Sequence, residues 1–178
     1  MNISEIIKKE LAGKEIKGKD GKIYRISIVG KKSFSVWVKS KDEPNRYGFM
    51  EEIRDLGKEL YLPIVADFTR ISGRGLYGKT IKLLSEAISK GVSFRSEVVN
   101  LRDKENLLNY IKEKKRLREE ICEKEAVSKT LFGHVLLSSF REVTVEYKRN
   151  GSKTSGVKAL KEFSLNQREG HLYFIGKK

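Results

Sequence analysis

Residues 22–40, KIYRISIVGKKSFSVWVKS, decide how the fold is interpreted. Apolar and polar side chains alternate on both sides of Gly30-Lys31-Lys32, and this period of two residues is typical of half-buried β-strands. The sequence therefore predicts strands at 22–29 and 33–40, joined by a tight hairpin turn. One face of the predicted pair is apolar and consists of Tyr24, Ile26, Ile28, Phe34, Val36 and Val38.

The opposite face of this predicted hairpin carries the single tryptophan of the chain, Trp37. Strand alternation places Lys39 beside it and Arg25 on the same face of the neighbouring strand. Proteins use an exposed indole ring flanked by cations to stack unpaired bases. The alternative is that a helix covers this face, so that Trp37 belongs to a second layer of the core.

Segments around the hairpin predict helices and further strands. Asn2 can cap a helix over residues 2–12, with Glu5 at the second position of a capping box. Phe49–Leu60 fits an amphipathic helix or a pair of strands equally well. Tyr61–Ile71 is expected to be extended, with Pro63 near a sheet edge because proline has no N–H to donate.

The second half of the chain predicts helices at 80–90 and 103–129, the latter long and charged with Asp103 as its N-cap. Strands are expected at 133–140, 142–149, 163–165 and 171–175, with a flexible loop at 150–156 and a turn at 166–170.

Short, hairpin-linked strands grouped around helices predict an α+β fold. We expect a small, largely antiparallel, twisted or barrel-like sheet packed with two or three helices. Residues 1–178 are expected to form a single nucleic-acid-binding domain, for which the charge below gives the reason.

The charge of the chain favours a polyanionic partner. Lys and Arg number 38 against 24 Asp and Glu, which gives a net charge of +14 and a pI near 9.8. This excess is larger than the charge of about 2–8 that solubility asks of a small domain. We therefore expect nucleic-acid binding, with DNA favoured over RNA and without enzymatic activity. The alternative is a surface that is basic only for solubility.

Other features of the composition exclude several classes of protein. A single cysteine, Cys122, excludes an internal disulfide, and two histidines, His134 and His171, are too few for a zinc site. Neither a membrane-spanning apolar run nor the apolar core of a signal peptide is present. We therefore expect a cytoplasmic protein that does not bind a membrane and that has no cofactor. One glutamine, Gln167, among many Lys and Glu is typical of thermophiles. The chain can be a whole protein or part of a larger one.

Residues 73–80, GRGLYGKT, match the pattern G-x-x-x-x-G-K-[ST]. They resemble the Walker A loop of P-loop NTPases, which implies a nucleotide held by Gly73, Gly78 and Lys79 and Mg²⁺ held by Thr80. The chain departs from that family because 133–138 ends in Ser138 where a magnesium-binding acid belongs. The alternative is a glycine-rich turn before a helix whose N-terminus holds a nucleic-acid phosphate.

Glu146-x-Lys148, on a predicted strand, resembles half of the PD-(D/E)xK nuclease pattern. The resemblance implies Mg²⁺ on Glu146 and a water molecule oriented by Lys148. The preceding segment, 133–138, contains no acid to supply the other half. An ordinary half-buried strand gives the same alternation, and the nuclease remains an alternative function.

The leading hypothesis assigns nucleic-acid contact to the hairpin and to basic residues in loops and strand ends. It requires no catalytic residue, metal or cofactor, and Mg²⁺ enters only under the two alternatives. The candidate residues are Arg25, Lys31, Lys32, Trp37, Lys39, Arg70, Arg74, Tyr77, Lys79, Lys148, Arg149 and Lys153.

Overall fold

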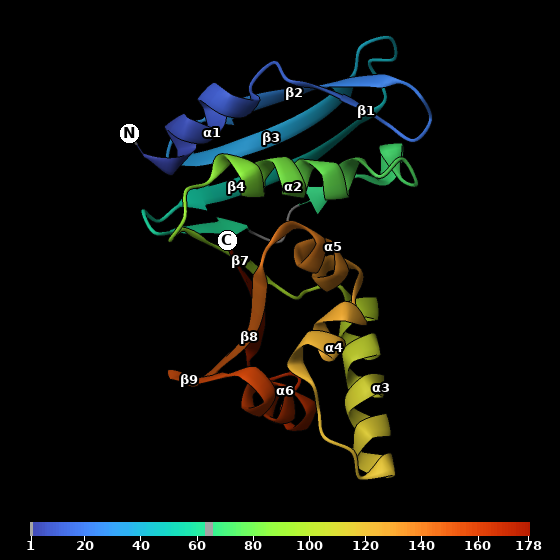
Figure 1. The fold of residues 1–178 in the computed structure, drawn as a ribbon, viewed down its shortest axis with the longest axis vertical. Helices are drawn as coiled ribbons and strands as arrows, with labels where there is room; N and C mark the ends of the chain where they lie inside the picture. Colours follow the sequence, from blue (N-terminus) through green and yellow to red (C-terminus); the bar gives the residue numbers. More distant parts are fainter. Residues whose placement is uncertain (1, 63–65) are drawn as a thin grey trace. The chain divides into compact units, whose positions relative to one another are not determined.

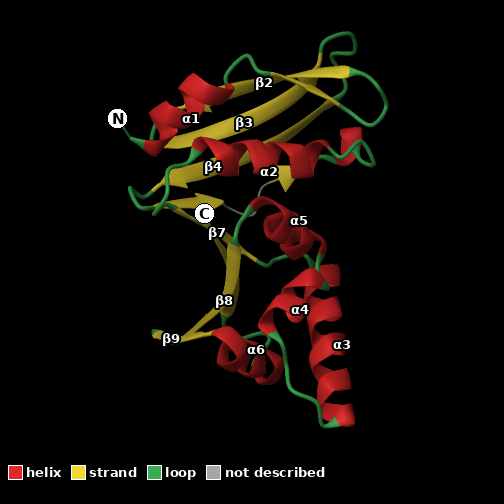
Figure 2. Ribbon diagram, in the orientation of Figure 1, coloured by secondary structure: helices red, strands yellow, loops and turns green. Residues whose placement is uncertain are grey.

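The computed structural model describes residues 2–62 and 66–178 (Figure 1). Within these residues, six α-helices and ten mostly antiparallel strands form an α+β fold (Figure 2). The predicted fold class is confirmed, although the sheet is open rather than barrel-like and the helices exceed the two or three expected. Pro63 and its predicted place near a sheet edge lie outside the described residues.

The chain divides into two compact units, which we call unit 1 (Met1–Phe94 with Lys178) and unit 2 (Arg95–Lys177). Two such units are compatible with one domain or with two, so the single domain over 1–178 stays a prediction.

Unit 1 contains an antiparallel sheet in the order β1-β2-β3-β4-β5, with β6 also paired to β4. The predicted hairpin is confirmed as β2 and β3, and Phe49–Leu60 forms strands rather than a helix. The elements are α1 (Ile3–Leu11), β1 (Glu15–Lys17), β2 (Ile23–Gly30), β3 (Ser33–Ser40), β4 (Tyr47–Asp55), β5 (Glu59–Leu62), β6 (Ala66–Asp67), a 3₁₀ turn η1 (Thr69–Ile71) and α2 (Leu76–Ala87).

Helices α1 and α2 form the core of unit 1 with the apolar face of the β2–β3 hairpin. Helix α1 begins with the predicted capping box, in which Asn2 and Glu5 each accept a hydrogen bond from the other's backbone N–H. Figure 1 shows both helices on the same side of β2, β3 and β4. The predicted apolar face is buried except for Ile28, which is half-buried. The helices contribute Ile3, Ile7, Leu11, Leu76, Ile81 and Leu84 to this core.

A β-bulge in β4 determines which of its side chains face the core. Phe34 pairs with Ile53 and Val36 pairs with Met50, so Ser35 alone on β3 matches Glu51 and Glu52 on β4. Glu52 adopts the left-handed conformation, with φ 54°. Because of this extra residue, Met50 and Ile53 are both buried although they are three positions apart.

Unit 2 contains a sheet in the order β7-β10-β8-β9, in which β8 is antiparallel to β10 and β9. The predicted strands at 142–149 and 171–175 are confirmed as β8 and β10. The elements are β7 (Ser93–Glu97, which begins in unit 1), α3 (Leu101–Leu117), α4 (Glu123–Ser128), α5 (Leu131–Ser139), β8 (Glu142–Arg149), β9 (Ser152–Ser155), α6 (Gly156–Leu165) and β10 (His171–Lys177).

Two predicted strands in unit 2 are wrong. Residues 133–140, expected as a strand, belong mostly to α5, which Thr130 caps by accepting a 2.9 Å hydrogen bond from the Gly133 N–H. Residues 163–165, also expected as a strand, close α6. The apolar run Val135-Leu136-Leu137 within α5 is too short to distinguish the period of a helix from that of a strand.

The long charged helix predicted for 103–129 is divided into α3 and α4. Arg118 ends α3 in the left-handed conformation, with φ 57°. The N-cap of α3 is Asn100 rather than Asp103. Asp103 is buried and accepts hydrogen bonds from the backbone N–H groups of Leu131 and Phe132 at the start of α5. The predicted cap residue therefore serves a different helix.

Candidate nucleic-acid interface

Three aromatic side chains gather on the face of the unit 1 sheet opposite the core. Trp37 on β3 lies directly across from Phe49 on β4, with ring centroids 4.8 Å apart. Tyr47 is 5.7 Å from Trp37 and 6.4 Å from Phe49. All three are half-buried, while the alternating residues Val36, Val38, Gly48 and Met50 are buried. We call Trp37, Tyr47 and Phe49 the aromatic strip.

Two cations lie over the aromatic strip. The Lys39 Nζ is 5.1 Å from the centroid of the Trp37 ring, and the Arg70 Cζ is 4.6 Å from that of Tyr47. Among the described residues, neither Lys39 nor Arg70 forms an ion pair with a carboxylate. The hydrogen bonds from Thr69 and, to a smaller extent, the charge of Arg70 lower the pKa of the Asp67 carboxyl. Neither cation has a carboxylate in direct contact among the described residues, so both can meet an anionic ligand at the aromatic surface.

Short side chains border the strip on the β2 side. Ser27 pairs directly with Trp37, and Ser35 lies two residues before Trp37 on the same face of β3. Serine side chains are much smaller than an indole ring, so the edge of Trp37 toward β2 is not covered by a long neighbour. Arg25, further along β2, lies opposite Lys39 and is paired with Glu15 at 3.0 Å.

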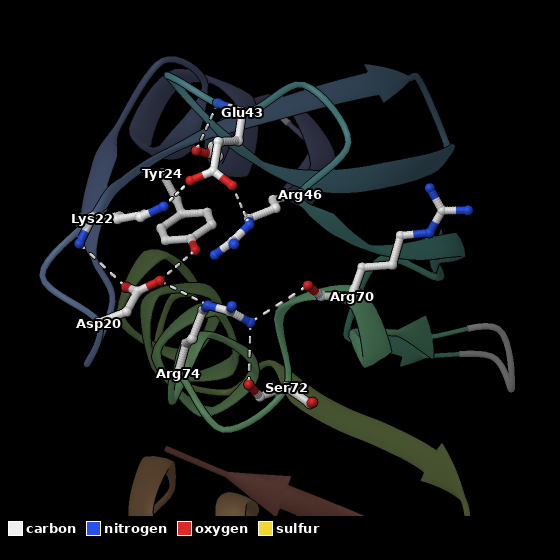
Figure 3. Close-up of polar contacts among 9 residues, drawn as sticks. Asp20, Lys22, Tyr24, Glu43, Arg46, Arg70, Ser72 and Arg74 are labelled. Carbon is white, nitrogen blue, oxygen red and sulfur yellow. Dashed lines mark hydrogen bonds and ion pairs between the residues drawn. The ribbon is translucent and has the colours of Figure 1, made fainter.

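A group of basic residues lies at the end of the unit 1 sheet where β2 begins and β3 ends (Figure 3). Asp20 accepts hydrogen bonds from the Arg74 Nε at 2.7 Å and from the Tyr24 hydroxyl at 2.9 Å. Glu43 forms ion pairs with two cations of the group. We call Lys22, Arg46, Arg70 and Arg74 the basic loop cluster.

Hydrogen bonds to Asp20 fix Arg74. Burial by itself raises the pKa of the Asp20 carboxyl, but the hydrogen bonds from Tyr24 and Arg74 outweigh burial and hold this pKa below the ordinary 3.8. The ionised carboxylate orients the Arg74 guanidinium, whose Nη1 also donates to the carbonyls of Arg70 and Ser72 at 3.4 and 3.3 Å. The side chain of Arg70 points away from this network (Figure 3) and lies over Tyr47 instead. Arg70 thus connects the basic loop cluster to the aromatic strip.

The segment 73–80 does not have the geometry of a nucleotide-binding loop. Helix α2 begins at Leu76, so Gly78, Lys79 and Thr80 lie within the helix rather than around a phosphate. Thr80 is fully buried and its hydroxyl donates to the Leu76 carbonyl at 2.7 Å, where no metal can reach it. The Lys79 Nζ donates to the Lys17 carbonyl. A 3₁₀ turn, η1, precedes the segment in place of a parallel strand.

Glu146, the acid of the predicted nuclease pattern, is a buried residue paired with three cations. Its carboxylate accepts from the Arg95 Nη1 at 2.5 Å and is paired with Lys153 at 3.1 Å and Lys148 at 3.6 Å. Burial raises its pKa, but the hydrogen bonds from Arg95 and Lys153 outweigh burial, so the pKa lies below the ordinary 4.5. The part of the chain that the structure describes contains no group of three or more His, Cys, Asp or Glu suited to a metal ion.

The other predicted contact residues belong to other elements of the two units. Lys31 and Lys32 are in the β2–β3 turn, at the opposite end of these strands from the basic loop cluster. Tyr77 is on α2 and meets the ring of Phe68 edge-on. Three candidates belong to unit 2, where Lys148 and Lys153 pair with Glu146 and Arg149 pairs with Glu169. The structure thus gathers Trp37, Lys39, Arg25, Arg70 and Arg74 in unit 1.

Sequence reasoning missed Lys22, Arg46, Tyr47 and Phe49. The spacing of Tyr47 and Phe49 matches the alternation of a strand, but the bulge after Met50 breaks this alternation within the same segment. A tyrosine and a phenylalanine two residues apart, close in sequence to several arginines, are the pattern that could have identified them.

Comparisons with known proteins do not assign the chain to a family. No family model, no curated protein and no solved structure matches the chain. Across residues 2–62 and 66–178, the helices are all too short or too polar to cross a membrane.

Proposed function

We propose that the chain binds nucleic acid through the outer face of the unit 1 sheet. The observation that carries this proposal is the pairing of Lys39 with Trp37 and of Arg70 with Tyr47, in which each cation lies over an outward-facing ring. A polynucleotide offers the two groups that such a surface recognises, because its bases stack on aromatic rings and its phosphates attract cations. The net charge of +14 supports the same proposal through long-range attraction.

The proposal is for binding without catalysis. The hydroxyl of Thr80 donates to a backbone carbonyl and the carboxylate of Glu146 is paired with three cations, and these contacts favour binding over either enzymatic alternative. The single Cys122 is exposed and unpaired with another cysteine. A free exposed thiol suits the reducing cytoplasm, where we propose that the protein meets its nucleic-acid partner.

Two double variants with the same loss of charge test the proposal. Lys39→Ala/Arg70→Ala removes the cations over the aromatic strip, and Lys148→Ala/Lys153→Ala removes two cations from unit 2. Affinities for DNA and RNA oligonucleotides are measured between about 50 and 200 mM salt. We expect the unit 1 variant to bind at least tenfold more weakly, with a log–log salt slope lower by about 1.4 on single strands or 1.8 on duplexes.

The unit 2 variant is expected to bind much like the wild type. Equal weakening of the two variants would indicate a diffuse basic surface and contradict the proposed site. No binding of the wild type to any polynucleotide at about 50 mM salt would contradict the proposed function itself.

A further inference from the structure

We propose that the ligand of unit 1 is single-stranded nucleic acid, whose unpaired bases stack on the aromatic strip while the adjoining phosphates lie on the basic loop cluster. This inference rests on the proposed function and specifies its ligand. Two independent features carry it, namely the arrangement of the rings and the arrangement of the arginines.

The three rings of the aromatic strip come from two neighbouring strands, and their planes are inclined to one another. Trp37 is 4.8 Å from Phe49 and 5.7 Å from Tyr47, with planes inclined by 33° and 46°. Bases in a duplex are stacked about 3.4 Å apart and cover each other's faces. Bases that stack on adjacent rings of the strip must therefore be unstacked from each other, and a single strand permits this at low cost whereas a duplex resists it.

The neighbours of Trp37 along its β2 side favour contact with a base because they are small. Ser27 and Ser35 flank Trp37 with short side chains. Lys39 is exposed, and its Nζ lies over the indole, 5.1 Å from the ring centroid. This flexible side chain moves aside when a base stacks on the ring, and its ammonium group then meets the adjoining phosphate. The half-buried Trp37 ring is already held by Phe49 and Tyr47, so little side-chain entropy is lost when a base binds.

The arginines provide a path for the backbone that continues from the strip. Arg70 lies over Tyr47, and its carbonyl accepts a hydrogen bond from Arg74. Asp20 orients Arg74 and Glu43 orients Arg46, so these guanidinium groups are fixed before a ligand arrives (Figure 3). Their side chains remain 22% and 37% exposed, respectively. Guanidinium groups bind phosphate through pairs of parallel hydrogen bonds, which suits a backbone that bends over the end of the sheet.

The test compares a single-stranded DNA 12-mer, the RNA of the same sequence and the corresponding blunt duplex, all with the full chain. Fluorescence anisotropy of the labelled strand measures affinity, and the emission of Trp37 reports contact with the single indole of the chain. We expect single strands to bind at least tenfold more tightly than the duplex and to quench Trp37. Trp37→Ala should weaken single-strand binding by about 5- to 150-fold while changing duplex binding little.

Trp37→Phe is the matched control, because it keeps an aromatic face in the same position and should retain most of the affinity. Tyr47→Leu provides a second variant in case Trp37→Ala fails to fold, and circular dichroism checks the fold of each. Quenching by DNA, by RNA or by both supports the inference. The ratio of the DNA and RNA affinities shows whether the protein distinguishes deoxyribose from ribose.

Two results would overturn the inference while leaving nucleic-acid binding intact. One is duplex binding as tight as single-strand binding, and the other is single-strand binding that neither quenches Trp37 nor depends on it. Failure of every polynucleotide to bind would instead remove the proposed function on which the inference rests.

Discussion

The two units use lysines on their strands in different ways. On β3, Lys39 follows Trp37 by two residues and lies over its ring. On β8, Lys148 follows Glu146 by two residues and pairs with its buried carboxylate, as does Lys153. A cation committed to a buried carboxylate stabilises the fold, whereas a cation over an outward aromatic ring is available to a ligand. The net charge of +14 therefore does not indicate how many basic residues are available to contact a ligand.

The largest effect that we expect concerns the buried carboxylate of unit 2. Glu146→Ala removes a buried carboxylate that accepts a hydrogen bond from the Arg95 Nη1 at 2.5 Å. Removing one member of a buried ion pair costs about 3–5 kcal/mol of unfolding free energy. Urea denaturation followed by circular dichroism measures this loss. Glu142→Ala is the matched control, since Glu142 is exposed on the same strand, and we expect a change within about 0.5 kcal/mol.

A loss below about 1 kcal/mol for Glu146→Ala would contradict the structural role assigned to this residue. The contrast between the units would then disappear, because the cations of unit 2 would be as free as those of unit 1.

The acid stability of unit 2 should depend on the same carboxylate. The folded-state pKa of Glu146 lies below 4.5 because its hydrogen bonds outweigh burial. Its contribution to stability is therefore complete above pH 4.5 and is lost as the pH falls through the folded-state pKa. Thermal unfolding between about pH 6 and pH 3 should show a falling melting temperature, and this fall should be shallower in Glu146→Gln. The same slope in both proteins would show that other carboxylates control acid unfolding.

Each unit also contains a strand glycine packed against an aromatic ring, and these glycines should be equally intolerant of a side chain. A Cβ at Gly48 would lie 2.6 Å from the Phe68 ring, and one at Gly176 would lie 2.6 Å from the Phe140 ring. We expect Gly48→Ala and Gly176→Ala each to cost about 1–3 kcal/mol through overpacking. The control is Ser35→Ala, which changes a half-buried strand position without a clash. Gly13→Ala would not serve, because Gly13 has φ 82° and a side chain there would strain the backbone. A neutral Gly48→Ala would contradict the inward orientation of this residue in β4.

The smallest effect is expected for the stability of Trp37→Ala. Truncation of a core tryptophan costs about 3–5 kcal/mol, but Trp37 is half-buried and we expect about 1–2 kcal/mol from its lost contacts with Phe49 and Tyr47. Equilibrium unfolding in urea measures this value. A loss of 4 kcal/mol or more would place the ring in the core and remove the distinction between ligand-binding and structural residues in unit 1.

The sequence was sufficient to predict a helix or strand where one face of that element is buried and the other is not. The alternation in 22–40 predicted β2, β3 and the outward position of Trp37, because a period of two survives in a regular antiparallel pair. The capping box at Asn2 and Glu5 likewise predicted the start of α1. The physical cause of each pattern lies within the segment itself, so the sequence of that segment is enough to predict it.

The remainder of the fold depends on contacts between distant residues. Asp103 has the sequence context of an N-cap for its own helix, but it accepts hydrogen bonds from the start of α5, 28 and 29 residues later. The basic loop cluster likewise joins Asp20 to Arg74, which are 54 residues apart. Local propensity and periodicity do not reveal pairings between residues this far apart, so half of the candidate site was not predicted.

The bulge at Glu51 and Glu52 determines how the aromatic strip responds to a deletion in the gene. Loss of one of these two codons would place Met50 two positions before Ile53, and simple alternation would then keep Met50 and Ile53 toward the core and Tyr47 and Phe49 on the outer face. Loss of one codon within a regular strand exchanges the two faces beyond the deletion, whereas at this position it would remove the bulge and keep both faces of β4. Homologues that keep the aromatic strip should therefore have either this spacing between Phe49 and Ile53 or one residue fewer, even where the glutamates themselves differ.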